Sequence, residues 1–162
     1  MNLSSIKLII SEVDGIITEG LVGMGEMDVT IFKQFCTKDF EAINLIKKMD
    51  YSFVFMSADA AINMSMCRKR NIAFFQAERS KKDVYHRILE KYSVSANEVL
   101  YVGHTYSDIE CVRMSAVSMC PEDSVNSVKN AVDYVIPVYG GAGVLSYVYE
   151  MLLKASRSCL EE

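Results

Sequence analysis

The stretch Leu8-Ile9-Ile10-Ser11-Glu12-Val13-Asp14-Gly15 decides the fold. Its first three residues are apolar in succession, which predicts a strand that is buried on both faces of a parallel sheet. Ligands bind beyond the carboxyl ends of such strands, so the polar residues that follow are candidates for a functional site. Glu12 and Asp14 lie two positions apart. We expect their carboxylates to point the same way and either to share a metal ion or to divide the nucleophile and acid roles.

The rest of the chain alternates short apolar runs with segments of helical periodicity. Apolar runs follow at 53–56, 72–75, 99–102, 116–119 and 134–136. Helices are predicted after Asp39 to about 48, between the run 53–56 and about 70, and at about 82–92, 107–114, 124–130 and 144–154. This alternation predicts the α/β class, with a doubly wound, mostly parallel sheet. We expect a single domain over 1–155 and a loosely held tail over 156–162.

A hairpin is expected between the first strand and the first helix. Two short apolar runs, 21–24 and 29–32, flank the turn-like segment Gly25-Glu26-Met27-Asp28. Asp39 then stands where a side chain that caps the next helix would be placed.

Composition excludes several classes of protein. The 162 residues carry a formal charge of −4 without a basic cluster, so we expect no nucleic-acid partner. No apolar run approaches the roughly 18 residues of a membrane span. The five cysteines form no CxxC pair, and the N-terminus has no signal-peptide pattern, so we expect a reducing cytoplasm. A chain of this length has a full core but no second domain to cover a ligand.

Chemically active side chains also follow the other predicted strands. Ser57 and Ala58 come directly after the run 53–56, where the hydroxyl and the next backbone N–H groups would suit a phosphate oxygen. Ser57 equally suits a helix N-cap. Lys81 opens the helix that follows 72–75, either facing the pocket or solvated, with Lys82 as its possible substitute.

A third group follows the run 99–102. Gly103 and His104 begin it, and Asp108 ends it. His104 is interpreted either as a metal ligand or as a residue that caps or packs against the strand end. Asp108 is a carboxylate suited to a divalent cation, directly or through water.

This series resembles the haloacid dehalogenase (HAD) superfamily, over about residues 6–155. Residues 13–15, the hairpin glycines, residues 35–39 and Gly140-Gly141-Ala142-Gly143 look like its capless group of 3-deoxy-octulosonate 8-phosphate phosphatases. The same group includes the phosphatase-like domain of some sialic acid cytidylyltransferases. The resemblance implies a HAD-like, Rossmann-like sheet with a small β-hairpin flap and no cap domain.

The resemblance also implies roles for individual residues. Glu12 stands at the position of the family's nucleophile, and Asp14 at the position of its general acid and base. Ser57 stands at the position of the hydroxyl that binds the phosphate, and Lys81 at the position of the lysine that binds it. Magnesium is expected to be bound by Glu12, the Val13 carbonyl, His104 and Asp108. Substrate contacts are expected from Lys38, Ser57, Ala58, Lys81 and Gly141.

Four substitutions depart from the family pattern. Glu12 is longer than aspartate by one methylene, which moves the carboxylate by roughly 1.5 Å. His104 is an imidazole at a position where a hard oxygen ligand binds magnesium, and it would suit a transition metal better. Ala142 replaces a basic residue, and Phe40 replaces a glycine.

Two hypotheses follow from these departures. The first is a catalytically impaired or inactive member of sugar-acid metabolism, acting as an oligomeric or regulatory module, with a cytidylyltransferase as a possible partner. The alternative is an active divalent-metal-dependent phosphatase of a phosphorylated 3-deoxy sugar acid. In both, a capless domain can roof its pocket only with the hairpin at 20–35 and a neighbour's glycine-rich tail, so we expect a homo-oligomer, a tetramer.

Overall fold

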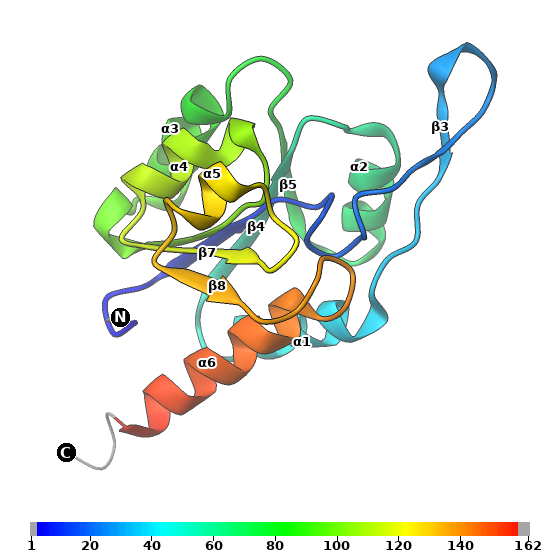
Figure 1. Cartoon of the computed structure of the whole chain (residues 1–162). Helices are drawn as coiled ribbons and strands as arrows, with labels where there is room; N and C mark the ends of the chain where they lie inside the picture. Colours follow the sequence, from blue (N-terminus) through cyan, green and yellow to red (C-terminus); the bar gives the residue numbers. More distant parts are fainter. Residues whose placement is uncertain (1–2, 159–162) are drawn as a thin grey trace.

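The computed structural model describes residues 3–158 and has a central six-stranded sheet (Figure 1). The strand order is β5-β4-β1-β6-β7-β8, and every ladder between neighbours is parallel. The strands are β1 Leu8–Ser11, β4 Ser52–Ser57, β5 Ala73–Gln76, β6 Val99–Val102, β7 Val117–Pro121 and β8 Tyr134–Ile136. The predicted α/β class with a mostly parallel sheet is therefore confirmed.

Helices cover both faces of this sheet. Their bounds are α1 Thr37–Lys48, α2 Ala61–Lys69, α3 Lys81–Tyr92, α4 Ile109–Met114, α5 Asn126–Lys129 and α6 Val144–Ser158. Helices α1, α2 and α6 pack into one hydrophobic core, and α3, α4 and α5 pack into the other. Figure 1 shows α1 and α6 below the sheet and α3, α4 and α5 above it. The sheet is doubly wound, as predicted.

Strand β1 shows why a short apolar run was enough to predict this architecture. Ile9 packs into the first core, whereas Leu8 and Ile10 pack into the second, and none of the three is exposed. Its two neighbours are β4 and β6. Burial on both faces requires apolar residues in succession rather than in alternation.

The predicted hairpin forms a separate two-stranded antiparallel sheet of β2 Gly23–Met24 and β3 Thr30–Phe32. The 3₁₀ turn η1 Glu26–Asp28 joins the strands, and the hairpin stands away from the body of the molecule (Figure 1). Between residues 3 and 158 there is no cap domain. The apolar side chains that the hairpin exposes are Leu21, Val22, Met24, Met27, Val29, Ile31 and Phe32.

Two details of helix boundaries differ from expectation. Asp39 lies inside α1 and does not cap it; its Oδ1 instead accepts hydrogen bonds from the N–H (2.8 Å) and hydroxyl (3.1 Å) of Ser146 in the first turns of α6. The expected tail at 156–162 begins inside α6, which continues to Ser158, and residues 159–162 lie outside the described part of the chain.

The described helices were also compared with the dimensions of a bilayer. None of them combines the length and the apolar character that a membrane span requires.

Candidate active site

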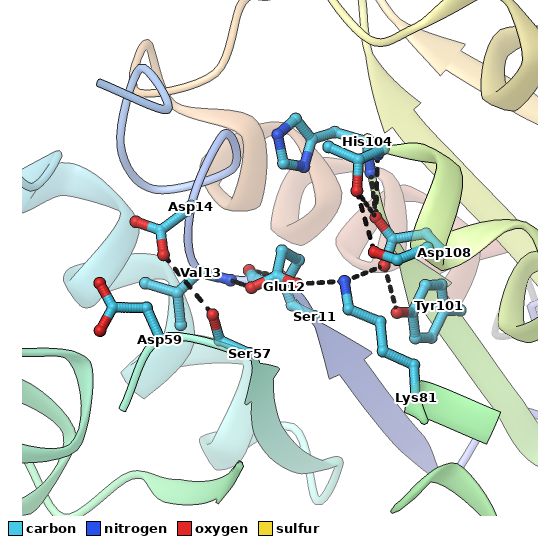
Figure 2. Close-up of polar contacts among 12 residues, drawn as sticks. Ser11, Glu12, Val13, Asp14, Ser57, Asp59, Lys81, Tyr101, His104 and Asp108 are labelled. Atoms are coloured by element: carbon cyan, nitrogen blue, oxygen red, sulfur yellow. Dashed lines mark hydrogen bonds and ion pairs between the residues drawn. The ribbon is translucent and has the colours of Figure 1, made fainter. Parts of the chain in front are cut away.

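The candidate site lies at the carboxyl end of β1, in the middle of the sheet. The chain pairs β1 with β4 on one side and with β6 on the other, which makes this edge a topological switch point. Residues that follow β1, β4 and β6 and the start of α3 meet there (Figure 2).

An inner lysine cluster is formed by Glu12, Lys81, Tyr101 and Asp108. The Lys81 ammonium donates to Glu12 Oε2 and to Asp108 Oδ1, so one cation joins two carboxylates. The side chains of Lys81 and Glu12 are 6% exposed and that of Asp108 is not exposed at all. Glu12 Oε1 accepts the N–H of Val13 at 2.9 Å. This cluster is closed to solvent.

Asp108 is held by more donors than Lys81 alone. Tyr101 donates its hydroxyl to Oδ1 at 2.7 Å, and the backbone N–H groups of His104 and Thr105 donate to Oδ2, both at 2.9 Å. Burial opposes the charge of Asp108, but Lys81 and these hydrogen bonds outweigh it and lower its pKa. Burial also opposes the charge of Lys81, but Asp108 and Glu12 outweigh it and raise its pKa. These pKa shifts favour the protonated form of Lys81 and the ionised form of Asp108.

An outer lysine cluster is formed by Asp14, Lys33, Ser57, Asp59 and Asn63. Lys33 comes directly after β3 of the hairpin, and its side chain is not exposed at all. Its ammonium lies 2.9 and 2.8 Å from the two oxygens of Asp14 and 2.7 Å from Asp59 Oδ2. It also donates to Asn63 Oδ1 at 3.2 Å. The hairpin is thereby tied to the candidate acid and base.

Ser57 and Asn63 complete this outer cluster. The amide of Asn63 donates to Asp14 Oδ2 at 3.0 Å and to Ser57 Oγ at 3.3 Å. Ser57 Oγ lies 3.5 Å from Asp14 Oδ2. Ser57 ends β4, whereas α2 begins only at Ala61, so the N-cap interpretation of Ser57 is wrong.

Glu12 and Asp14 do not point the same way, contrary to the expectation from their spacing. Glu12 faces Lys81 and Asp14 faces Ser57, on opposite sides of the loop in Figure 2. Strand β1 ends at Ser11, so the period of two that governs side chains in a strand no longer applies at Asp14. The two carboxylates therefore serve different clusters.

The His104 side chain lies against the loop after β1. Its imidazole packs against Gly15, which has a φ of +78°, and a Cβ at this glycine would collide with the ring. His104 Nδ1 is buried and has no hydrogen-bond partner among the described residues. Glycine at position 15 is therefore what leaves room for the imidazole.

The remaining predicted substrate contacts lie outside the two clusters. Gly141 donates its N–H to the Ile16 carbonyl at 2.9 Å, which holds the glycine-rich segment against the loop after β1. Lys38 lies against Gly143, where a Cβ would meet its side chain. Ala58 is exposed at the end of β4. Their roles in binding stay predictions.

Four residues of the clusters were not predicted as site residues: Tyr101, Lys33, Asn63 and Asp59, which lies two positions after Ser57. Tyr101 carried a signal, because a tyrosine within a fully buried strand needs a hydrogen-bond partner. Lys33 carried none, since its contact with Asp14 depends on how the hairpin folds back. Asn63 carried no signal beyond its place in the segment that was predicted to be helical up to about residue 70.

The predicted metal ligands do not form a metal centre as they are placed. Among residues 3–158, no three His, Cys, Asp or Glu side chains gather in a group that could hold an ion. Both oxygens of Asp108 are already engaged, by Lys81 and Tyr101 on one and by backbone N–H groups on the other. Glu12 likewise uses both of its oxygens within the protein.

Comparison with known proteins connects this geometry to a family. The model of the haloacid dehalogenase-like hydrolases matches residues 28–148. The 3-deoxy-D-manno-octulosonate 8-phosphate phosphatase KdsC of Haemophilus influenzae is 27% identical over 159 residues, which cover 94% of this chain and 86% of that protein. KdsC of Escherichia coli K12 is 26% identical over 153 residues, covering 93% and 81%.

Solved structures agree with this relationship. The cobalt-bound phosphatase of Haemophilus influenzae superposes with a TM-score of 0.89 at 26% identity, covering 96% of this chain and 91% of that one. The Moraxella catarrhalis phosphatase, in complex with magnesium, phosphate and KDO, shares the fold, with a TM-score of 0.87 at 20% identity over 94% and 88%. The chain belongs to the haloacid dehalogenase-like hydrolase family.

Proposed function

We propose that this protein is a phosphomonoesterase that releases phosphate from a phosphorylated 3-deoxy sugar acid of the octulosonate or nonulosonate class. The observation that carries the proposal is the inner lysine cluster, in which Lys81 joins the carboxylates of Glu12 and Asp108 at the carboxyl end of β1. The KdsC relatives, whose name specifies 3-deoxy-D-manno-octulosonate 8-phosphate, support the substrate class. They favour this function over the impaired module that the four substitutions predict.

The proposed reaction uses Glu12 as the nucleophile and Asp14 as the acid and base. A Glu12 oxygen forms a bond to phosphorus while the bond from phosphorus to the sugar oxygen breaks, and that oxygen takes a proton from Asp14. Water then attacks phosphorus and gives its proton to Asp14. The Glu12 oxygen leaves with the electron pair, which restores the carboxylate and releases inorganic phosphate.

The positions of the side chains fit these roles unequally. Asp14 is 23% exposed and borders Ser57, so it can reach a ligand at the mouth of the site. Glu12 is buried and bound to Lys81, so it must turn toward phosphorus from within a closed cluster. We therefore expect a nucleophile slower than the family's aspartate.

The proposed reaction assigns no role to a metal ion, and divalent cations are included only as components of the assay. The relatives with solved structures include cobalt-bound and magnesium-bound forms. In this chain, the carboxylate oxygens of Glu12 and Asp108 are engaged by protein donors, so the described residues do not fit a preformed magnesium site. No step of the proposed reaction passes through a metal.

A homo-oligomer, a tetramer, is proposed from the hairpin. The hairpin exposes seven large apolar side chains between residues 21 and 32, and exposed apolar patches mark interaction surfaces. The change Ile31→Asp is expected to give smaller species in analytical ultracentrifugation. Met64→Asp, at an exposed apolar side chain of α2, is the matched control that leaves the assembly intact. A monomeric wild type would contradict the proposal.

A second candidate function is a catalytically silent oligomeric or regulatory module, with a cytidylyltransferase as the proposed partner. The specific observation in its favour is that the imidazole of His104 packs on Gly15 while Asp108 is saturated by protein donors. Under this candidate the clusters preserve the fold of the site without its chemistry.

One assay separates the two candidates. A panel of sugar phosphates is incubated with Mg²⁺, Mn²⁺, Co²⁺ or Zn²⁺, with the wild type beside the double variant Glu12→Asp/His104→Asp. Wild-type turnover of about 1 s⁻¹ or more is expected for a phosphatase. An inert wild type beside an active double variant would overturn the phosphatase proposal in favour of the silent module.

A further inference from the structure

Three hydrogen-bond donors from three different elements converge on one oxygen of Asp14. Oδ2 lies 2.8 Å from Lys33 Nζ, 3.0 Å from Asn63 Nδ2 and 3.5 Å from Ser57 Oγ. Lys33 follows β3, Asn63 lies in α2 and Ser57 ends β4. These donors are assembled by the tertiary fold and not by one local turn.

The three donors on Oδ2 exceed the lone-pair sites of that single oxygen. A carboxylate offers about four lone-pair sites on two oxygens, or about two on each. Lys33 also reaches Oδ1, at 2.9 Å, so the same carboxylate group receives four contacts from the three donors. A phosphoryl group presents three strong acceptor oxygens in a tetrahedral arrangement and would accept the same donors one by one.

The three donors are buried, whereas the acceptor, Asp14, is partly exposed. The side chain of Lys33 is not exposed, Asn63 is 0% exposed and Ser57 is 2% exposed. Asp14 is the exposed partner, at 23%, and it lies on the loop beyond the end of β1. Of Asp14 and its three donors, Asp14 is therefore the side chain that solvent reaches.

We propose that Lys33, Ser57 and Asn63 form an anion cradle that Asp14 occupies as an internal ligand, and that a phosphoryl group displaces Asp14 when it binds. The identity of the external ligand rests on the proposed function. While both oxygens of Asp14 accept from Lys33, the carboxylate is not available to a leaving group. When the phosphoryl group binds, it displaces the Asp14 carboxylate and frees it from Lys33. Binding of the phosphoryl group and activation of Asp14 therefore occur together.

Asp59 provides the matched control for this inference. It also pairs with Lys33, at 2.7 Å, and its side chain is 37% exposed, but its carboxylate has no contact with Ser57 or Asn63 among the described interactions. A general loss of negative charge would strengthen phosphate binding to a similar degree in Asp14→Ala and Asp59→Ala. Removal of an internal ligand strengthens it in Asp14→Ala alone.

The test is isothermal titration of the full chain with inorganic phosphate. We expect Asp14→Ala to bind phosphate at least about tenfold more tightly than Asp59→Ala does. In the Asp14→Ala background, Asn63→Leu and Lys33→Met should each weaken binding by about tenfold, whereas Lys82→Met on exposed α3 surface should not. Far-UV circular dichroism checks that each variant is folded, and Asn63→Leu keeps the test decisive if Lys33→Met unfolds.

Equal affinities of Asp14→Ala and Asp59→Ala would overturn the cradle, as would the absence of phosphate binding in every variant. These readouts do not depend on turnover. A protein that binds phosphate as expected but hydrolyses no sugar phosphate would refute the proposed function and leave the cradle standing.

Discussion

The two lysine clusters lie on either side of one loop and differ in how they are built. The inner cluster takes its members from the residue after β1, from α3, from β6 and from the 3₁₀ turn η3 Tyr106–Asp108, and it is closed to solvent. The outer cluster takes its lysine from the base of the projecting hairpin, and two of its carboxylates are partly exposed. A closed cluster on rigid elements fixes charge, whereas an open one can exchange a partner for a ligand.

The largest difference between the clusters is expected in stability. Lys81→Met leaves Glu12 and Asp108 buried without a cation and should lower the free energy of unfolding by about 3–5 kcal/mol in a urea titration. Lys82→Met is the control, because Lys82 is 48% exposed and should change stability by no more than about 0.5 kcal/mol. A loss for Lys81→Met as small as that of the control would contradict the difference between the clusters.

The second largest effect is expected in how the stability of the inner cluster depends on pH. The lowered pKa of Asp108 contributes stability that is fully present above its unfolded value of about 3.9 and is lost as pH falls through the folded value. The raised pKa of Lys81 contributes stability that is lost only as pH rises beyond about 10.4. The urea concentration at the unfolding midpoint of the wild type should thus decrease when the pH is lowered below about 4. The variant Lys81→Met should not show this decrease. Parallel acid profiles would contradict the role of Lys81.

Lys33→Met should cost less than Lys81→Met. Asp14 and Asp59 are 23% and 37% exposed, so water can solvate them when the ammonium is removed. We expect a loss of about 1–2 kcal/mol, measured by urea unfolding. A loss equal to that of Lys81→Met would mean that the outer cluster is as closed as the inner one.

Tyr101→Phe should have the smallest effect. It removes one hydroxyl donor from Asp108 and leaves the contacts with Lys81 and with two backbone N–H groups in place. The expected loss is about 1 kcal/mol by the same urea titration. Tyr92→Phe, at a tyrosine outside both clusters, provides the control, and equal losses in the two variants would show that the hydroxyl of Tyr101 does not support Asp108.

The sheet was predictable because its signals are local. A run such as Leu8 to Ile10 is apolar at every position only where helices cover both faces, and buried apolar runs recur within β4 and β6. The carboxyl ends of parallel strands meet at one edge, so Glu12, Lys81 and Asp108 were predicted at the same site before their contacts were known. Asp39 was misjudged, since its partner Ser146 is 107 residues away in the chain.

The outer cluster was harder to predict for the same physical reason. The direction of Asp14 depends on a loop that leaves the strand at Ser11, where periodicity no longer applies. Lys33 reaches Asp14 only because the hairpin returns toward the sheet, and nothing in the residues around Lys33 encodes that return. The cradle is a product of tertiary structure.

The phosphatase proposal is tested most directly by the release of inorganic phosphate from 3-deoxy-D-manno-octulosonate 8-phosphate, measured for the wild type beside Glu12→Gln. The nucleophile role predicts wild-type turnover of about 1 s⁻¹ or more and at least a roughly hundredfold loss in the variant. Release by the wild type that is no faster than release by Glu12→Gln would contradict it.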